Sequence, residues 1–352
     1  MKNQKVLSLI LALLMVVSLI GCGAKEEAAP AEAAPAVEAA PAEEAAPAEE
    51  AAPAEPEKWA PEKEVEIICQ ASAGGGTDIN IRTVADIAFK NQFTPVQWIV
   101  NYASTAAPSL LMSHAGEKEY LFALPSAQVL ELMINDLGFS TKDMTYLGIV
   151  CFDDLSLCVT KDSPYQTIED LLEAARNETL SYGGTKRTSF DGLSCTLINK
   201  YCGTNFNFVQ HEGSGEVMTD LLGGHIDVGI FNPQECLGQL EAGEIRALVS
   251  LSREPIQNPA YEGVPTFIEI GYPEIVITEA RGFAGPPDMP QDAIDFFDEC
   301  IGKVCASDEW LETYIAPNAL TATYLPSAEA QAFWDAQTTE WAALIDEMGL
   351  KN

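Results

Sequence analysis

Alternation of strand-like and helical segments along residues 59–352 predicts an α/β fold. This body is long enough for two domains, each with its own core. The pattern also occurs twice, because a second series of strands and helices starts after about residue 165. We therefore expect two α/β units rather than one small module.

The first unit contains three short β-rich runs, at residues 65–69, 96–100 and 120–123. Helical stretches near 79–90 and 127–134 follow the first and third of these runs. A longer β-rich stretch at 146–159 is expected to pass from one domain to the next.

The second unit opens with a helix near 168–176, which Thr167 and Asp170 begin with capping-box spacing. Its predicted strands lie near residues 180–182, 206–209, 227–231 and 247–251. The stretch 276–283 is expected to return to the first domain. Two final helices, near 291–305 and 329–348, are expected to pack on that domain.

The N-terminus has the three parts of an export signal: Lys2 and Lys5, an apolar run at 6–20, and small residues before Cys22. The run is too short for a transmembrane helix. The segment resembles a bacterial lipoprotein signal, which implies a signal peptide at 1–21 and a lipid anchor on Cys22. The alternative is an ordinary signal peptide whose cleavage site contains a cysteine.

Residues 22–58 consist almost entirely of Ala, Pro and Glu. The prolines block a continuous helix, and the repelling carboxylates favour an extended chain that reaches on the order of 100 Å. We interpret the segment as a spacer that holds the body away from a membrane. The alternative is a disordered interaction tail.

The chain carries 53 acidic and 19 basic residues, a formal charge of −34. This balance argues against binding to nucleic acid or anionic lipid, since both require clustered Lys and Arg. An anion site in such a protein has to be local, built from backbone amides and helix N-termini.

A glycine-rich turn, residues 73–78, directly follows the first predicted strand. Its glycines allow a ligand to approach the backbone, and the next helix offers free N–H groups to a carboxylate or phosphate. The turn matches neither the dinucleotide fingerprint nor the P-loop. The alternative is a plain tight turn with Asp78 as the helix cap.

Three later segments, 182–185, 211–215 and 220–227, contain similar glycine turns. The first two are expected at strand ends, where α/β folds place ligand crevices. The third is expected to end a helix at Gly223 or Gly224 before the next strand.

The order of these motifs resembles the substrate-binding proteins of tripartite tricarboxylate transporters, the TctC/Bug family. The resemblance runs from about residue 65 to 349 and rests on five segments, which are 74–78, 219–227, 243–248, 264–266 and 281–282. It implies a two-lobed, periplasmic-binding-protein-like (Venus flytrap) fold with crossing hinge strands. Lobe 1 would comprise 59–152 and 277–352, and lobe 2 would comprise 153–276.

The resemblance also implies a small carboxylate ligand, di- or tricarboxylate or amino-acid-like, held by loops of both lobes and delivered to membrane permease subunits. The implied ligand-binding residues are Ala73, Gly74, Gly75, Gly76, Thr77, Asp78, Asn101, Ser126, Thr185, Thr188, Ser189, Gly213, Ser214 and Asn232. The implied location is extracytoplasmic, on the outer face of the cell membrane.

Departures from the family pattern bear on specificity. Ala73 replaces a proline, His211 and Glu212 replace a Tyr-Lys pair, and Lys186 with Arg187 replaces small residues. Glu212 would repel a tricarboxylate if it lined the cleft, and the alternative is a solvated rim. Arg281 is expected near the hinge, either bridging to ligand or, as the favoured role, paired with a carboxylate.

An enzymatic function finds little support. The histidines are scattered, and no zinc-binding, Cys-x-x-Cys or Gly-x-Ser-x-Gly motif occurs. No cofactor or metal is expected. Cys69, Cys151 and Cys158 are expected as core residues, while pairing of Cys195 with Cys202, or of Cys300 with Cys305, stays open. The functional alternatives are a ligand sensor for a two-component system and an extracellular enzyme.

Overall fold

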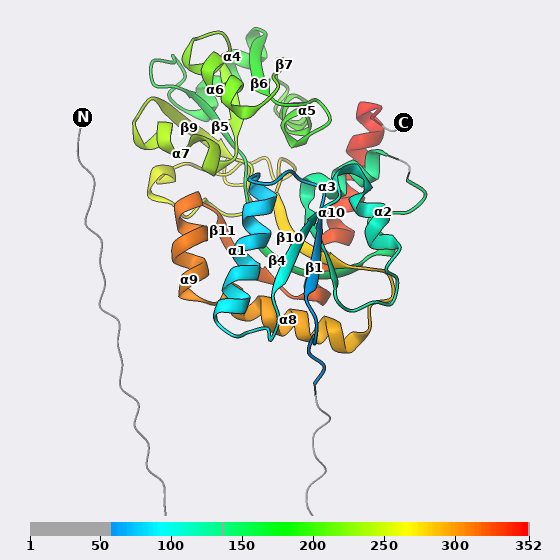
Figure 1. Cartoon of the computed structure of the whole chain (residues 1–352). Helices are drawn as coiled ribbons and strands as arrows, with labels where there is room; N and C mark the ends of the chain where they lie inside the picture. Colours follow the sequence, from blue (N-terminus) through cyan, green and yellow to red (C-terminus); the bar gives the residue numbers. More distant parts are fainter. Residues whose placement is uncertain (1–57, 136, 351–352) are drawn as a thin grey trace, which may run out of the picture. The chain divides into compact units, whose positions relative to one another are not determined.

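The computed structural model describes residues 58–135 and 137–350. The predicted signal peptide, Cys22 and the Ala/Pro/Glu linker up to residue 57 lie outside the described residues. The described residues form one compact unit, in which the strands form two separate sheets. Figure 1 shows these sheets in two lobes.

The first lobe is built on a mixed six-stranded sheet with the order β11-β4-β10-β3-β1-β2. Its strands are β1 (Val65–Cys69), β2 (Trp98–Tyr102), β3 (Tyr120–Pro125), β4 (Thr145–Phe152), β10 (Ala280–Gly285) and β11 (Thr321–Leu325). β1 runs parallel to β2 and β3, whereas β10 runs antiparallel to β3 and β4. The interior strands are nearly continuous apolar runs, as expected for a sheet covered on both faces.

The second lobe is built on a five-stranded sheet with the order β7-β6-β8-β5-β9. Its strands are β5 (Ser156–Thr160), β6 (Leu180–Gly184), β7 (Phe206–Gln210), β8 (Val228–Phe231) and β9 (Ile245–Ser250). β6 runs parallel to β7 and β8, and β5 runs antiparallel to β8 and β9. The parallel ends of β6, β7 and β8 therefore bring three strand-to-helix turns to one edge.

Helices cover both sheets (Figure 1). Those of the first lobe are α1 (Gly76–Lys90), α2 (Ala107–Met112), α3 (Ser126–Ile134), α8 (Gln291–Cys305), α9 (Asp308–Trp310) and α10 (Ser327–Met348). Those of the second lobe are α4 (Ile168–Asn177), α5 (Phe190–Cys202), α6 (Ser214–Leu222) and α7 (Pro233–Glu241). α9 continues into a π-helical turn at Leu311–Ile315, and short 3-10 turns lie at Ser104–Ala106, Thr141–Asp143, Pro259–Tyr261 and Ala316–Asn318.

Local sequence signals explain several helix boundaries. The predicted capping box of α4 is present, since the Thr167 hydroxyl accepts the Asp170 N–H and the Asp170 carboxylate accepts the Thr167 N–H. α6 ends at Gly223, as expected, and Gly224 takes a positive φ of 70° that favours glycine.

Two chain segments cross between the lobes. β4 ends at Phe152 in the first sheet and β5 begins at Ser156 in the second, while residues 251–279 lead back from β9 to β10. Helix α10 adds a third connection, because Trp341 packs against Phe190 with ring centroids 5.0 Å apart. The Lys200 ammonium also lies 2.6 Å from the Glu347 carboxylate.

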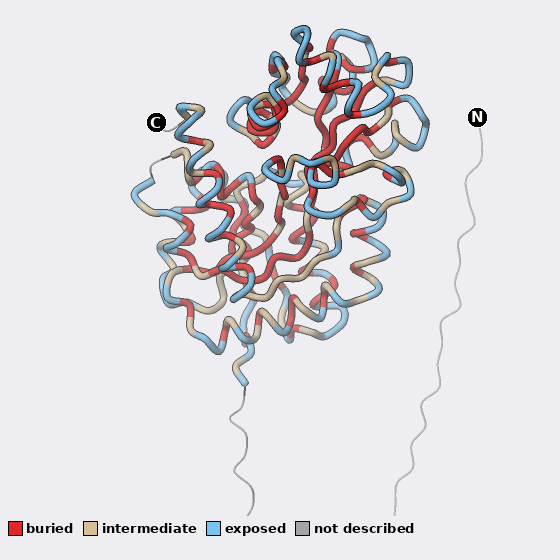
Figure 2. The backbone as a smooth tube through the Cα atoms, turned by 180° about the vertical axis from the view of Figure 1, so that it is seen from behind, coloured by how far each residue is buried: buried red, intermediate tan, exposed pale blue. Residues whose placement is uncertain are grey.

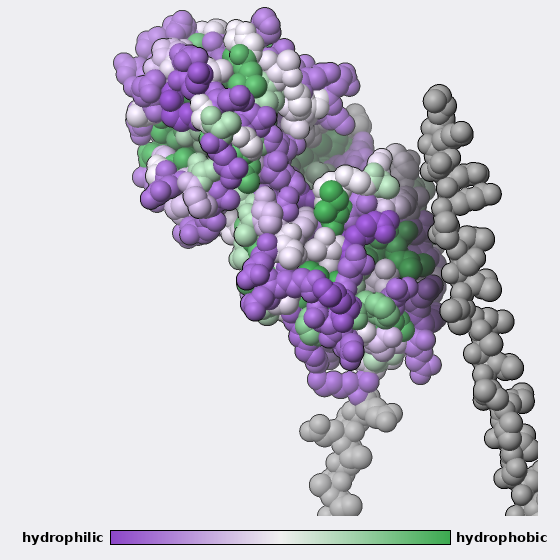
Figure 3. All heavy atoms as spheres, turned by 60° about the vertical axis from the view of Figure 1, so that its left-hand side comes forward, coloured by the Kyte–Doolittle hydropathy of each residue, from purple (hydrophilic) through white to green (hydrophobic). Residues whose placement is uncertain are grey.

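Buried residues follow the strands of both sheets, and exposed residues lie on the outer sides of the helices (Figure 2). One core cluster continues from the first sheet through α3 and α10 into the second lobe, and another lies between the first sheet and α1, α8 and α9. Hydrophilic residues cover most of the face seen in Figure 3, and apolar residues form small patches on both lobes.

The architecture confirms the predicted two-lobed α/β fold. The β-rich stretch at 146–159 forms β4 and β5 in different sheets, and β10 starts four residues later than expected, at Ala280. The sequence analysis did not identify the edge strand β11. Among the described residues no helix is both long enough and apolar enough to cross a membrane.

The eight cysteines of the body are free thiols in the structure, and seven of them are buried. Cys69, Cys151 and Cys158 are fully buried in strands, as expected for small core residues. Cys195 and Cys202 lie on α5, and Cys300 and Cys305 on α8.

Candidate ligand-binding site

The glycine turn of the first lobe is held by Asp78, which is 3% exposed in the first turn of α1. The Asp78 carboxylate accepts hydrogen bonds from the Gly74 N–H (2.8 Å), the Tyr102 hydroxyl (2.6 Å) and Arg82 Nε (2.8 Å). Gly74 has a φ of 83°, a conformation that favours glycine. The turn is therefore anchored within the chain before any ligand arrives.

Burial acts to raise the pKa of Asp78, but the hydrogen bonds from Gly74 and Tyr102 and the charge of Arg82 outweigh it, so its pKa lies below the ordinary value. Asp78 is therefore an ionised anchor at neutral pH.

The opposing turn, 185–189, is held in the same manner by Asp191 at the start of α5. Asp191 Oδ2 accepts hydrogen bonds from the Thr185 N–H (2.7 Å) and the Thr185 hydroxyl (2.6 Å). Ser189 caps the helix by accepting the Asp191 N–H at 3.3 Å. Burial raises the pKa of Asp191, whereas the Thr185 hydrogen bonds lower it, with burial dominating.

Two further helix N-termini lie at the same edge of the second sheet. Gly213 precedes α6, and Asn232 caps α7 with its backbone N–H donating to Glu235 Oε2 at 3.2 Å. Asn232 Nδ2 also donates to the carbonyl of Asp153 at 3.1 Å. α6 and α7 pack against each other. The second-lobe turns are thus tied to the segment that follows β4.

Asp153 and Arg281 form the centre of these contacts. Asp153 is 2% exposed and forms an ion pair with Arg281 Nη2, and its Oδ2 also accepts a hydrogen bond from Gln234 Nε2 at 3.0 Å. The Arg281 guanidinium lies against Gly76, because a β-carbon at Gly76 would stand 3.1 Å from Arg281 Nη1. A single ion pair therefore joins the first-lobe turn to α7 of the second lobe.

The two crossing segments meet beside this ion pair. The Asp153 N–H donates to the Glu279 carbonyl at 2.8 Å, and the Ser126 hydroxyl accepts the Ala280 N–H at 2.8 Å. Ser126 is fully buried, so its hydroxyl supports the start of β10. Glu279 therefore lies beside Asp153, where the two crossing segments meet.

Several residues predicted to bind ligand do not contact the Asp153–Arg281 ion pair. Asn101 Nδ2 donates to Glu66 Oε1 at 2.7 Å, along β1 and β2. Ala73 and Thr188 are exposed, and Thr77 and Ser214 are partly exposed in the first turns of α1 and α6.

The family departures are placed as follows. Glu212 is exposed, and its backbone N–H donates to Glu216 Oε2 at 3.1 Å. Arg187 donates to the Phe208 carbonyl at 3.1 Å and lies over the Phe208 ring. The favoured role of Arg281, structural pairing with a carboxylate, agrees with its ion pair to Asp153.

Sequence analysis missed Asp153, Gln234 and Glu279. Asp153 and Glu279 stand at the two points where the chain crosses between the sheets, and Gln234 lies in the first turn of α7. The sequence could have indicated Asp153 and Glu279, because each is an acidic residue at a predicted connection between the two domains, and Glu279 is close in sequence to Arg281.

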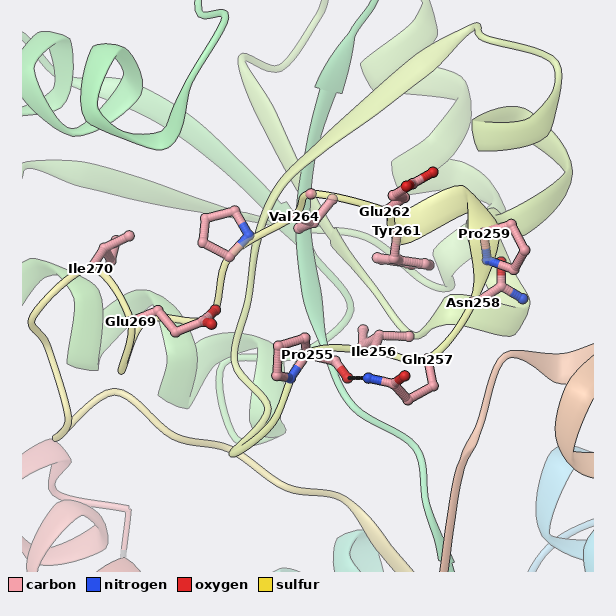
Figure 4. A pocket seen from close by; sticks show the side chains of 12 residues that line it. Pro255, Ile256, Gln257, Asn258, Pro259, Tyr261, Glu262, Val264, Glu269 and Ile270 are labelled. Carbon is pink, nitrogen blue, oxygen red and sulfur yellow. Dashed lines mark hydrogen bonds between the residues drawn. The ribbon is translucent and has the colours of Figure 1, made fainter.

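A pocket of about 780 Å³ lies elsewhere in the second lobe, within the segment 255–270. Figure 4 shows Pro255, Tyr261 and Glu269 around it, and none of the residues predicted to bind ligand lines it. Across residues 58–135 and 137–350, no group of three or more His, Cys, Asp and Glu side chains is arranged to hold a metal ion.

Residues 111–350 match the family model described as "Tripartite tricarboxylate transporter family receptor". This match covers more than half of the chain. The chain belongs to this family. A curated relative, the protein BugT of Bordetella pertussis, is 24% identical over 302 residues, which are 83% of this chain and 91% of BugT.

Solved structures agree with this TctC-family assignment at the level of fold. A TctC solute-binding protein from Polaromonas superposes with a TM-score of 0.72 and 21% identity, over 82% of this chain and 99% of that chain. An R. palustris protein solved with adipate gives a TM-score of 0.67 and 20% identity, over 82% and 98% of the two chains.

Next to the site, this TctC-family chain buries a second carboxylate, Asp154, which is 4% exposed. Its Oδ2 accepts a hydrogen bond from the Thr321 hydroxyl at 3.0 Å, and its Oδ1 has no hydrogen-bond partner among the described residues. Burial, opposed by Thr321 and assisted by the charge of Asp153, raises the pKa of Asp154 to about 7.

Asp154→Asn should therefore relieve a pH-dependent loss of stability. Because the folded pKa is raised, the native state keeps a proton that the unfolded chain releases near pH 4, and unfolding free energy falls between about pH 4 and 7 by up to roughly 4 kcal/mol. The asparagine has no such proton to lose. In urea unfolding at about pH 5 and about pH 8, the free energy of unfolding of the variant relative to that of the parent should be larger at the higher pH. A constant difference at both pH values would mean that Asp154 is ionised throughout.

Proposed function

We propose that this protein is the extracytoplasmic solute receptor of a tripartite transporter, which captures a small carboxylate between its lobes and delivers it to membrane permease subunits. The lipid on Cys22 and the spacer at 22–58 would hold the receptor at the outer face of the cell membrane. Membership of a family of transporter receptors supports the transport role. The solved relative that holds adipate supports a carboxylate ligand.

One observation carries the site assignment: the helix-initiating turns of both lobes are linked through the Asp153–Arg281 ion pair. Gly76 contacts Arg281, while Asn232 and Gln234 bind Asp153. In a two-lobed receptor, turns that meet at the hinge are the parts that approach each other when the lobes close. Backbone N–H groups at the starts of α1, α5 and α6 supply donors for a carboxylate in an acidic protein.

The proposal predicts saturable stabilisation by small carboxylates. We would record the melting temperature of the purified protein with succinate, glutarate, adipate, malate, citrate, aspartate and glutamate, and then measure each hit by calorimetry. A ligand present at about one hundred times its Kd should stabilise the native state by roughly 2.7 kcal/mol. Asp78→Ala should abolish the shift, because the glycine turn loses its anchor.

Asp170→Ala is the matched control. Asp170 also accepts backbone N–H bonds at the start of a helix, from Gln166 and Thr167, but it lies on α4 away from both turns. The control should melt lower than the parent and still respond to ligand. If none of these carboxylates shifts the parent protein, the proposed function is wrong and the family assignment describes only the fold.

A further inference from the structure

The residues around the crossing segments carry an excess of negative charge. The charges of Asp153, Asp191 and Glu235 all act on Glu279, and the charge of Arg281 opposes them. We call Asp153, Asp191, Glu235 and Glu279 the acidic cluster. Lys186 is exposed on the turn of Thr185, and Arg187 is engaged by Phe208.

Two members of the acidic cluster have bonding capacity left over. Asp153 is 2% exposed, yet its Oδ1 has no hydrogen-bond partner among the described residues. The partly buried carboxylate of Glu279 is influenced by burial and by neighbouring charges, and no hydrogen bond to it is found within residues 58–135 and 137–350. A buried acceptor without a partner is costly, so Asp153 Oδ1 is positioned to accept a hydrogen bond from a donor that is not part of the chain. The partly exposed Glu279 belongs to the segment whose backbone pairs with Asp153.

The pKa of Glu279 also favours a positively charged ligand group at the acidic cluster. Burial, followed by the charges of Asp153 and Asp191, raises the pKa of Glu279 well above its ordinary value, and Arg281 only partly opposes this. A second positive charge in the acidic cluster would favour the ionised carboxylate. The four carboxylates are not arranged as a metal site, since no metal-binding group of three or more such side chains occurs among the described residues.

We propose that the acidic cluster binds the ammonium group of the ligand, so that the receptor selects an amino acid or another aminocarboxylate over a carboxylate without an amine. Glu279 and Asp153 Oδ1 accept the ammonium hydrogens, and the amides of the helix-initiating turns hold the carboxylate. The inference rests on the proposed function and specifies the ligand class for that site. A plain dicarboxylate would place its second negative charge beside the ionised Asp153 and the other members of the acidic cluster, which is less favourable than placing an ammonium group there.

The geometry of an ammonium group suits this arrangement. It has three donors and no acceptor, so it can bond to two carboxylates at once, and charge-assisted bonds of this kind are among the stronger hydrogen bonds in proteins. Glu235 and Glu279 are exposed or partly exposed, so a ligand can reach them. Glu212, also exposed, is not required by the proposal.

The test compares ligand pairs that differ only in an amine: aspartate with succinate, glutamate with glutarate, and 2-aminoadipate with adipate. Calorimetry on the parent protein should give tighter binding for at least one aminocarboxylate than for its partner by about tenfold or more. Glu279→Gln should weaken that aminocarboxylate by about ten- to hundredfold while leaving or improving the amine-free partner. The substitution keeps the shape of the side chain and removes no hydrogen bond within the described chain.

Glu244→Gln is the matched control, because Glu244 is exposed in the second lobe and changes the net charge equally. It should leave the preference unchanged. Three outcomes would overturn the inference: amine-free carboxylates that bind more tightly than their partners, a Glu279→Gln variant that retains the preference, or stabilisation by Ca²⁺ alone. Each of the first two still leaves a carboxylate receptor. Failure of all ligands would instead contradict the proposed function.

Discussion

Arg281→Met should be among the most destabilising single substitutions in this protein. The Arg281 side chain is 12% exposed and is paired with Asp153, whose side chain is 2% exposed. Removing one partner of a buried pair leaves the other charge uncompensated, which costs about 3–5 kcal/mol. Asp153 would then lie near Glu279 without its guanidinium partner.

Urea unfolding of Arg281→Met, Asp153→Asn and the double variant separates this cost from lost packing. The double variant should be more stable than the sum of the single effects predicts, because the asparagine removes the charge that the methionine left unpaired. Lys303→Met is the control: it breaks the exposed Lys303–Glu299 pair and should change stability by no more than about 1 kcal/mol. Additive single effects would show that Arg281 and Asp153 are not energetically coupled.

The same substitution should also loosen the link between the lobes. Arg281 contacts Gly76 of the first-lobe turn, and Asp153 holds Gln234 and Asn232 of the second lobe. Arg281→Met removes the ion pair that links these turns. The increase in melting temperature caused by ligand should therefore become smaller, as should the free energy of unfolding.

Much of the fold follows from local sequence signals. The strand at 65–69, the helix at 291–305 and the capping box at Thr167 depend on residues close together in the chain, and each is found where it was expected. β11 escaped prediction because it is a short edge strand of mixed burial, paired only with β4. Its conformation depends on a partner about 170 residues away in the sequence, which local patterns do not encode.

The turns of the candidate site were predictable, whereas its charges were not. Glycines after a strand and before a helix identify the segment 73–78 whatever surrounds it. The acidic cluster, in contrast, comes from four separate segments, at Asp153, Asp191, Glu235 and Glu279, and each residue alone is an ordinary helix-cap or loop carboxylate. In a chain with 53 acidic residues, composition gives no reason to single out these four.

The same limit applies to the anion-binding amides. Sequence reasoning assigned the N–H groups of the turns to the ligand, but the structure shows that Gly74 and Thr185 already donate to Asp78 and Asp191. The side chains of the first helical turns thus hold part of each turn in place. The donors left for a ligand are the remaining amides of these turns.

Gly192→Ala should disrupt the second-lobe turn and with it ligand binding. Gly192 is buried in the first turn of α5, directly against the backbone of Arg187. A β-carbon at Gly192 would lie 2.2 Å from the Arg187 carbonyl oxygen and 2.5 Å from its carbonyl carbon. Because these are backbone atoms, no side-chain rotation relieves the overlap, and the turn 185–189 has to move away from α5.

That movement would separate Thr185 from Asp191, whose carboxylate accepts the two hydrogen bonds that Thr185 donates at 2.7 and 2.6 Å and that hold the turn. Overpacking of this kind costs about 1–3 kcal/mol, and loss of the two bonds adds to it. Unfolding in urea measures this loss of stability, and calorimetry with the best ligand measures the loss of ligand affinity. Gly238→Ala is the matched control, since Gly238 also lies in a helix but has no atom within 4 Å of an added β-carbon.

The control should be neutral or stabilised by about 0.5–1 kcal/mol, because alanine is the better helix former, and should bind ligand as the parent does. The contrast between the two glycines isolates the contact with Arg187 from the general effect of glycine in a helix. If Gly192→Ala keeps both its stability and its ligand affinity, the turn 185–189 is free to shift without consequence. In that case the second-lobe donors for the ligand are provided by the starts of α6 and α7.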